Sequence, residues 1–229
     1  QWGAPLLEHP HGGRGVLMGG GTGVQPARVV VLGAGNAGWK AARTAAAMDA
    51  EVLLLARSPQ RLRSLEADRS GRLTSVVSSR GLIERLVPTA DLVIGAVLTP
   101  GGRAPTLVDE ELVQAMRPGS VIVDVAIDQG GCIATSQETT HTNPTVSIHG
   151  VQHYAVGNMP GAVPFTSTEA LVSVTLPYIV GIAGRGLEEA FTERPELLSG
   201  LNTVQGSVCH PGVAKALGVT PRHPMACLR

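Results

Sequence analysis

The sequence predicts an α/β chain built on a doubly wound parallel sheet, and three observations support this fold class. Apolar runs of strand length alternate with segments of helix length along most of the chain. The apolar runs are rich in Val, Ile and Leu, as expected of strands that are buried on both faces. Apolar residues make up 43% of the chain and aromatic residues only 3%, so we expect a core built mainly of Val, Leu and Ala.

The expected elements follow one another in a regular order. We expect strands at residues 28–32, 52–55, 73–79 and 90–97 and within 120–131, and helices at 40–48, 80–87 and 109–116. Arg117-Pro118-Gly119 ends the last of these helices. One or two short strands are expected within 145–164, and a further helix runs from Ser167 to Ile182.

A glycine-rich turn joins the first strand to the first helix. Gly33, Gly35 and Gly38 form the pattern G-x-G-x-x-G, in which the first glycine permits a tight turn, the second lets the backbone approach a pyrophosphate, and the third brings helix against strand. The helix N-terminus offers its N–H groups to the phosphates. The pattern predicts a dinucleotide site of the Rossmann type at Gly33, Gly35, Asn36, Ala37 and Gly38; the alternative is a turn with a structural role only.

The end of the second strand bears on the choice of cofactor. Binders of NAD carry a carboxylate at this point, which holds the adenine ribose, whereas a nearby Arg can hold the 2′-phosphate of NADP. Here Ala56 stands at the carboxylate position and is followed by Arg57, Ser58 and, three residues on, Arg61. We therefore expect NADP(H) as the cofactor and NAD(H) as the second choice. The alternative is that these arginines belong to a solvated helix surface.

Composition excludes several other classes of function. The formal net charge is zero, so nothing favours nucleic acid or a membrane surface as a partner, and no apolar run of membrane-spanning length is apparent. The three cysteines, Cys132, Cys209 and Cys227, have no C-x-x-C spacing, and with the scattered histidines they predict no metal site. Their number and spacing favour a reducing, cytoplasmic setting.

Three domain segments are expected. Residues 1–27 contain the stretches HGGRG and GGGTG and resemble a connector rather than a core. Residues 28–186 form the dinucleotide-binding domain. Residues 187–229 form a tail with mostly helical character, which we expect to pack on this domain or on a half of the protein that is missing from this chain.

Three stretches carry a family resemblance that is more specific than the glycine pattern. They are DLVIGAVLTPGGRAPTLV at 91–108, MRPGSVIVDVAIDQGGC at 116–132 and HYAVGNMPGAVPFTST at 153–168. With HGGRGVLMGG near the start and GLNTVQG near the end, they resemble the alanine dehydrogenases, whose fold is shared by the soluble part of proton-translocating transhydrogenases. The resemblance is colinear from about residue 5 to residue 218.

The resemblance implies roles for further residues. The adenosine and its ribose would be bordered by Val97 and Leu98, and the nicotinamide by Ile127 and Asp128 on one side and by Asn158 and Met159 on the other.

Two residues are candidates for catalysis. The family's aspartate at the position of Asp128 takes part in catalysis, and a carboxylate there can stabilise a developing positive charge; the alternative is a cap on the following turn. His153 is the best-placed candidate for an acid/base histidine, although family members also carry His-Tyr at this point in a mainly structural role.

The chain also departs from the family pattern. Ala56, Phe165 and Val204 stand where the family has Asp, Arg and Tyr. The N-terminal substrate half, which in the family supplies a lysine for the substrate carboxylate and an acid/base histidine, has no counterpart here. Lys40 and Lys215 are the only lysines, and neither stands in the corresponding context.

Two classes of function follow from these observations. The first is an NAD(P)-dependent oxidoreductase that resembles alanine dehydrogenase and acts on an imine or an α-keto or amino acid, in a truncated or repurposed form. The second is a stand-alone NADP-binding domain with a non-redox catalytic role in a specialised pathway, or a module that senses the cofactor or binds a partner. The first class implies a small-molecule substrate and a homo-oligomer or a separate substrate-domain chain.

Overall fold

The computed structural model describes residues 1–68 and 71–227, which divide into two compact units. Unit 1 comprises residues 1–99 and 103–159, and unit 2 comprises 100–102 and 160–229; the last two residues of the chain lie outside the description. This division differs from the expected domain boundaries, because residues 160–186 group with the C-terminal part of the chain and residues 1–27 with the sheet.

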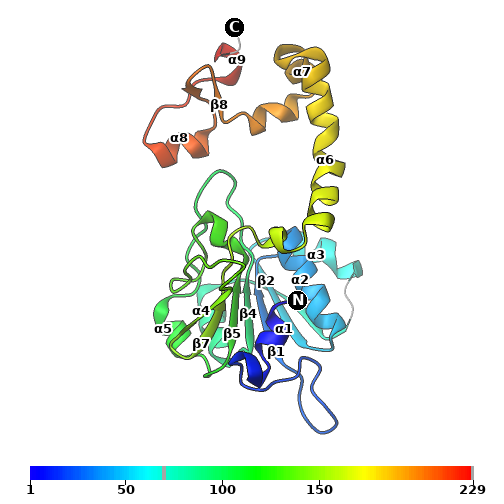
Figure 1. Ribbon diagram of the computed structural model, residues 1–229, viewed down its shortest axis with the longest axis vertical. Coiled ribbons are helices and arrows are strands. Elements are labelled where there is room, and N and C mark those ends of the chain that lie inside the picture. The colour runs from blue at the N-terminus through cyan, green and yellow to red at the C-terminus, as the bar shows by residue number, and fades with distance from the viewer. Residues whose placement is uncertain (69–70, 228–229) are drawn as a thin grey trace. The chain divides into compact units, whose positions relative to one another are not determined.

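Unit 1 is built on a seven-stranded sheet in the order β3-β2-β1-β4-β5-β7-β6. All neighbouring strands are parallel except β6 and β7. The strand order reverses between β1 and β4, as in doubly wound sheets, so the predicted fold class is confirmed (Figure 1). The strands are β1 Arg28–Leu32, β2 Glu51–Ala56, β3 Leu73–Val77, β4 Leu92–Gly95, β5 Val121–Asp124, β6 Thr145–Ile148 and β7 Val151–Tyr154.

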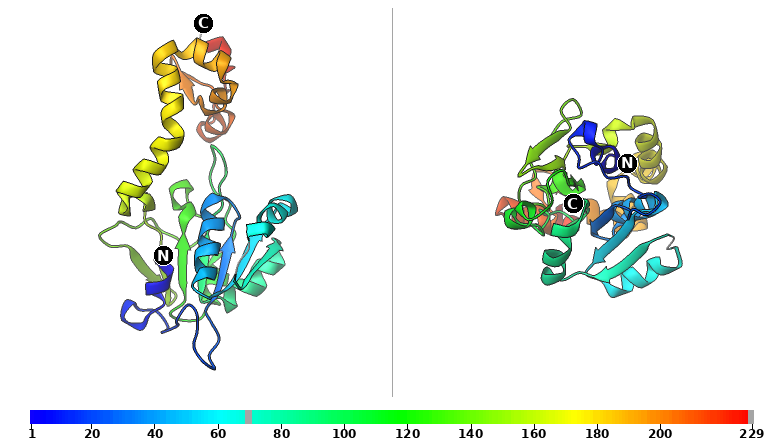
Figure 2. Two further views of the ribbon diagram at one scale, coloured as in Figure 1. Left: turned by 90° about the vertical axis from the view of Figure 1, so that its right-hand side faces the viewer. Right: turned by 90° about the horizontal axis from the view of Figure 1, so that it is seen from below.

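Helices cover both faces of this sheet, as Figure 1 and the turned views of Figure 2 show. Those of unit 1 are α1 Gly3–Leu6, α2 Asn36–Ala47, α3 Pro59–Leu65, α4 Arg80–Leu86 and α5 Glu110–Gln114. Short 3-10 helices lie at His9–His11, Glu66–Asp68, Val87–Thr89, Val125–Gln129 and Met159–Ala162. Side-chain caps explain several starts: Ser58, Ser79 and Asp109 each accept a hydrogen bond from the N–H group three residues on.

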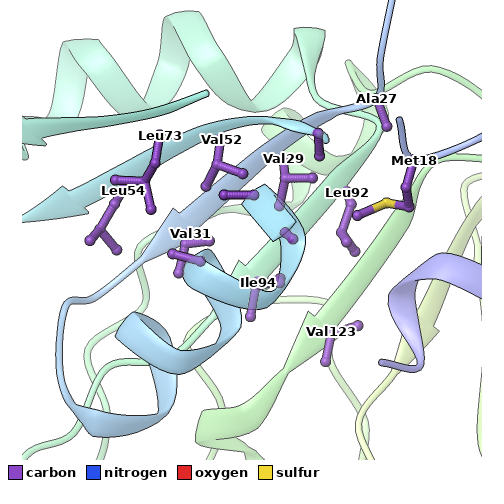
Figure 3. Close-up of a cluster of buried hydrophobic side chains, with 14 of the residues drawn as sticks. Met18, Ala27, Val29, Val31, Val52, Leu54, Leu73, Leu92, Ile94 and Val123 are labelled. Atoms are coloured by element: carbon purple, nitrogen blue, oxygen red, sulfur yellow. The ribbon is translucent and has the colours of Figure 1, made fainter. Parts of the chain in front are cut away.

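The core consists of two apolar clusters, one on each face of the sheet. Val29 and Val31 of β1 belong to the first cluster, which α2 and α3 cover (Figure 3). Val30 and Leu32 belong to the second, which α4 and α5 cover. The apolar strands are therefore buried on both faces, as their composition predicts.

The N-terminal segment contributes to the first cluster rather than serving as a connector. Leu6, Leu7 and Met18 are buried there, and Trp2 stacks on Tyr154 of β7 with ring centroids 5.0 Å apart. Eight glycines are spread through these 27 residues and obscure the apolar residues that anchor the segment.

Unit 2 contains one long helix, drawn in yellow in Figure 1, and a set of short elements. These elements are α6 Pro164–Arg185, α7 Leu187–Glu193, a 3-10 helix at Pro195–Gly200, β8 Thr203–Val204, β9 Ser207–Val208, α8 Pro211–Leu217 and α9 Pro224–Cys227. The predicted helical character of the tail is observed, and the β8–β9 hairpin is an addition to it.

α6 corrects the expectation that no apolar segment reaches membrane-spanning length. Its 22 residues have a mean hydropathy of 1.3 over the most apolar window, so by length and composition alone it could cross a membrane. None of its residues is buried within the part of the chain that the structure describes. The sequence obscures this property because Ser, Thr and Pro are interspersed among the apolar residues.

Candidate functional site

The three glycines of the turn between β1 and α2 differ in what surrounds them. A Cβ built at Gly33, whose φ is +109°, would lie 2.4 Å from the carbonyl oxygen of Ala96, and one at Gly38 would lie 2.0 Å from that of Gly33. No atom of the described residues lies within 4 Å of a Cβ built at Gly35. Gly33 and Gly38 are thus required by close packing, whereas Gly35 faces open space in which a ligand can approach the backbone.

The turn leads directly into the N-terminus of α2. The first backbone hydrogen bond of this helix runs from the N–H of Trp39 to the carbonyl oxygen of Gly35, so the N–H groups of the residues before Trp39 have no partner inside the helix. Asn36 and Ala37 are exposed there. The helix begins at Asn36 rather than at the expected Lys40, which brings its positive dipole end next to the turn.

A cavity of about 850 Å³ opens beside this turn. Its lining comes from the carboxyl ends of β1 to β4 and includes the predicted residues Gly33, Gly35, Ala56, Arg57, Ser58, Arg61, Val97 and Leu98. The structure therefore brings together the predicted pyrophosphate, ribose and adenosine residues. Asn36, Ala37 and Gly38 continue the turn next to this lining, and the remaining predicted residues belong to a second group.

Ser78, Ser79 and Arg80 also line the cavity and were not expected there. They follow β3, the strand next to β2. The rule that ligands bind at the carboxyl ends of parallel strands could have identified them, because β3 was predicted from the sequence. Arg80 is held in place by ion pairs with Glu84 and Asp109.

Around the end of β2, some polar side chains already have hydrogen-bond partners within the protein and others do not. Ser58 caps α3 through its Oγ, which accepts the N–H of Arg61 at 3.2 Å. The Arg61 side chain donates from Nε to the carbonyl oxygen of Ala34, 2.9 Å away in the glycine turn. Arg57 is exposed, and its guanidinium makes no hydrogen bond or ion pair with the described residues. The Arg57 guanidinium is therefore available to a ligand at this edge.

The second group of predicted residues meets at the ends of β5 and β7. Asp128 is exposed, and its Oδ1 accepts the backbone N–H of Asn158 at 3.0 Å. Asn158 has a φ of +51°, a left-handed conformation that Asn tolerates better than most residues. Ile127 is 7% exposed, and Met159 packs against the first apolar cluster. The structure thus joins the two segments that the resemblance places around a nicotinamide.

His153 is fully buried in β7, and both of its ring nitrogens are engaged. Nδ1 donates to the carbonyl oxygen of Val151 at 3.0 Å, which leaves Nε2 to accept the hydroxyl of Thr135 at 2.8 Å. Burial lowers the pKa of His153 and keeps the ring neutral. This bonding favours the structural interpretation of His153 over the catalytic one.

Among residues 1–68 and 71–227 no group of three His, Cys, Asp or Glu side chains is arranged to hold a metal ion.

Comparison with known proteins relates this geometry to a family. The family model described as "Alanine dehydrogenase/PNT, C-terminal domain" matches residues 1–211. An alanine dehydrogenase of Methanococcus maripaludis is 51% identical over 94% of this chain, and one of Mycobacterium tuberculosis is 48% identical over all of it. The chain covers 58% and 62% of these two relatives, respectively, so it spans about three fifths of their length.

Solved structures agree with the sequence comparison. The structure of an L-alanine dehydrogenase matches 95% of this chain with a TM-score of 0.85 and 49% identity, and the chain covers 60% of that protein. A transhydrogenase from Sinorhizobium meliloti matches 61% of this chain with a TM-score of 0.55 and 28% identity, and 41% of that protein is covered. The chain therefore belongs to the alanine dehydrogenase/PNT family, and the part of that family it matches is the C-terminal domain.

Proposed function

We propose that the chain binds a nicotinamide dinucleotide at the carboxyl ends of β1 to β5 and forms the cofactor-binding part of an oxidoreductase resembling alanine dehydrogenase. The observation that carries this proposal is the contrast among the three turn glycines. Gly33 and Gly38 are tightly packed, whereas Gly35 faces open space beside the start of α2 and the 850 Å³ cavity. A pyrophosphate requires such an open approach to backbone N–H groups.

The cofactor would extend across unit 1 in two parts. The adenosine half would lie in the cavity between the ends of β2 and β4, against Val97 and Leu98. The nicotinamide half would lie toward Ile127, Asp128, Asn158 and Met159, and it would supply or accept the hydride. Asp128, which is exposed and held by the N–H of Asn158, would stabilise positive charge that develops on an imine or an amino acid substrate.

We propose NADP(H) rather than NAD(H) as the preferred dinucleotide. Ala56 ends β2 without a carboxylate, and the Arg57 guanidinium beside it is available at the cavity edge. A carboxylate here would repel a 2′-phosphate, whereas a guanidinium binds one through charge-assisted hydrogen bonds. NAD(H) remains the second choice because the relatives of this chain are alanine dehydrogenases whose pattern carries an aspartate at this position.

The variant Arg57→Ala tests this preference. We expect the wild-type chain to bind NADPH more tightly than NADH in calorimetric titrations. The substitution should weaken NADPH binding by about 1.5–3 kcal/mol and leave NADH nearly unchanged. Arg63→Ala is the matched control, because Arg63 lies on α3, the helix that follows Arg57, and outside the cavity lining. Equal affinity of the wild type for both dinucleotides would contradict the preference.

A stand-alone dinucleotide-binding domain without redox activity is the second candidate function. It is favoured by one observation: the two lysines, Lys40 in α2 and Lys215 in α8, are both exposed and lie outside the cavity lining. Neither lysine stands in the sequence context of the lysine that holds the substrate carboxylate in the family. The turnover assay described in the Discussion distinguishes the two candidates.

We also propose that a protein surface covers α6. This helix is apolar around its circumference, with Phe165, Leu171, Val174 and Ile179 each more than half exposed, and a helix of this kind is normally buried. A second copy of the chain and a substrate half, whether on a separate chain or on a further part of the same protein, are the candidates for this surface. The chain spans about three fifths of the length of these relatives, which is consistent with a substrate half as the partner.

Charged substitutions on α6 provide a test. We expect the wild-type chain to sediment as a dimer or larger species, and the double variant Val174→Glu/Ile179→Glu to shift toward monomer, because buried carboxylates oppose association. The control Ser173→Glu/Thr175→Glu places the same charges at neighbouring polar positions. A wild-type monomer at all concentrations would contradict the second copy and leave the substrate half as the candidate.

A cytoplasmic location completes the proposal. Cys132, Cys209 and Cys227 are all free and buried, and thiols of this kind are typical of proteins in reducing compartments.

A further inference from the structure

Asp124, the last residue of β5, carries a carboxylate that the proposed chemistry does not use. It is 0% exposed, and an ionised group in such a position needs hydrogen bonds to offset the loss of water. Its Oδ1 accepts the N–H of Ala126 at 3.1 Å. Its Oδ2 accepts the N–H groups of Cys132 and Ile133 at 3.0 and 3.2 Å. One carboxylate therefore ties together both ends of the loop formed by residues 125–133.

Neighbouring residues pack closely around the Asp124 carboxylate, so even a methyl group added at either of two adjacent glycines would contact it. A Cβ at Gly131, whose φ is +75°, would lie 2.9 Å from Oδ2, and one at Gly95 would lie 3.1 Å from Oδ1 and 2.4 Å from the Cys132 sulfur. The Cys132 thiol lies 3.5 Å from Oδ1. Burial, reinforced by the adjacent carboxylate, raises the pKa of this thiol, so it remains protonated and donates to Asp124.

The loop that Asp124 closes carries Ile127 and Asp128. Asp128 stands at its exposed tip, where Oδ1 accepts the N–H of Asn158. Two sets of hydrogen bonds therefore hold the tip of the loop. One is the bond between Asp128 and the N–H of Asn158, and the other is the set that the Asp124 carboxylate accepts from the two ends of the loop. Asp124 itself is buried beneath the loop and reaches no ligand.

We propose that Asp124 is the positioning residue of the nicotinamide half of the site, because it holds the 125–133 loop in the conformation that presents Ile127 and Asp128 to the cofactor. This inference rests on the proposed function. It differs from a general stabilising role in one respect. Loss of the Asp124 carboxylate should harm recognition of the nicotinamide selectively and leave the adenosine half of the site intact.

The test substitution is Asp124→Asn. Since an amide has only one acceptor oxygen, its NH₂ group must face either the Ala126 N–H or the N–H pair of Cys132 and Ile133, and one end of the loop is released. Asp91→Asn is the matched control. Asp91 is 6% exposed, accepts the N–H of Arg28 at 2.8 Å and forms an ion pair with Arg14, but it precedes β4 and so lies at the opposite end of the sheet.

Two measurements on the full 229-residue chain provide the readouts. The first is hydrogen–deuterium exchange without ligand, in which Asp124→Asn should accelerate exchange at residues 125–133 and Asp91→Asn should not. The second is calorimetric titration with NADPH and with 2′-phospho-ADP-ribose, which lacks the nicotinamide. For Asp124→Asn we expect NADPH affinity to fall about tenfold and the affinity for the fragment to change by less than about twofold. NADH and ADP-ribose serve as a second pair of probes.

The outcomes separate the inference from the proposed function. An equal loss for dinucleotide and fragment, or unchanged exchange in the loop, would overturn the inference alone. A wild-type chain that binds neither NADPH nor NADH would overturn the proposed function and this inference with it. If Asp124→Asn does not fold, Gly131→Ala takes its place: the added Cβ would lie 2.9 Å from Oδ2 and the φ of +75° disfavours alanine, so the same end of the loop is disturbed without removing the charge. The same selective loss is then expected.

Discussion

Replacing Gly35 with valine should abolish dinucleotide binding and leave the fold intact. Gly35 has a φ of −70° and a ψ of −173°, which a valine adopts readily, and its missing Cβ points into open space among the described residues. The valine methyl groups would occupy the path of the pyrophosphate. We expect affinity for either dinucleotide to fall at least about a hundredfold, or about 2.8 kcal/mol, with a melting temperature close to that of the wild type.

Two other glycines make this result specific. Gly38→Val should lower stability as well as binding, because its Cβ would lie 2.0 Å from the carbonyl oxygen of Gly33. Gly21→Val should change neither, since no described atom lies within 4 Å of a Cβ built there and Gly21 precedes β1, away from the cavity lining. Calorimetric titration and thermal melting of the three variants give the comparison. Near wild-type affinity of Gly35→Val would mean that the turn is structural only.

The second large effect concerns turnover. Asp128 is present, but neither lysine of the sequence stands in the context of the family's substrate lysine, and His153 has both ring nitrogens engaged inside β7. Orientation of reactants contributes up to about 7–11 kcal/mol in favourable cases. We therefore expect the chain alone to reduce pyruvate with ammonia at least about a thousandfold more slowly than a full-length alanine dehydrogenase, while it still binds its dinucleotide.

The assay follows the absorbance of NADPH or NADH in the presence of pyruvate and ammonia. Residual turnover should be suppressed further in Asp128→Asn. The control is Asp49→Asn: Asp49 is exposed in the turn between α2 and β2 with a φ of +63°, where Asn is equally tolerated. Rapid turnover by the chain alone would show that another residue replaces the lysine and histidine, and it would exclude the binding-only function. Dinucleotide binding without any turnover would favour that function.

Of all parts of the fold, the sheet is the one that the sequence predicts best. Runs such as Val29–Leu32 are apolar at every position, and only strands buried on both faces need that composition. α2 starts at Asn36, before the expected Lys40, because its cap is Gly35, which has no capping side chain that would mark the start in the sequence. Pairing of β7 with β5 depends on long-range register, which a short run of apolar residues does not encode.

The sequence predicts those parts of the candidate site that consist of residues close together in the chain. It does not reveal the parts that form when distant segments meet. The glycine turn and the end of β2 are local patterns, and the cavity contains both. The contact between Asp128 and Asn158 joins segments that are 30 residues apart and came only from the family resemblance. Asp124 resembles an ordinary polar residue at the end of a strand. Its role emerges only when the loop folds back so that the N–H groups of Cys132 and Ile133 reach it.

A crystal structure of the 229-residue chain with NADPH would test the central claim most directly. The account predicts the pyrophosphate over Gly35 against the N–H groups of Asn36 and Ala37, and the adenosine between the ends of β2 and β4 with its 2′-phosphate at Arg57. The nicotinamide should lie beside Asp128 and Asn158. A dinucleotide bound elsewhere, or none bound at saturating concentration, would contradict the account.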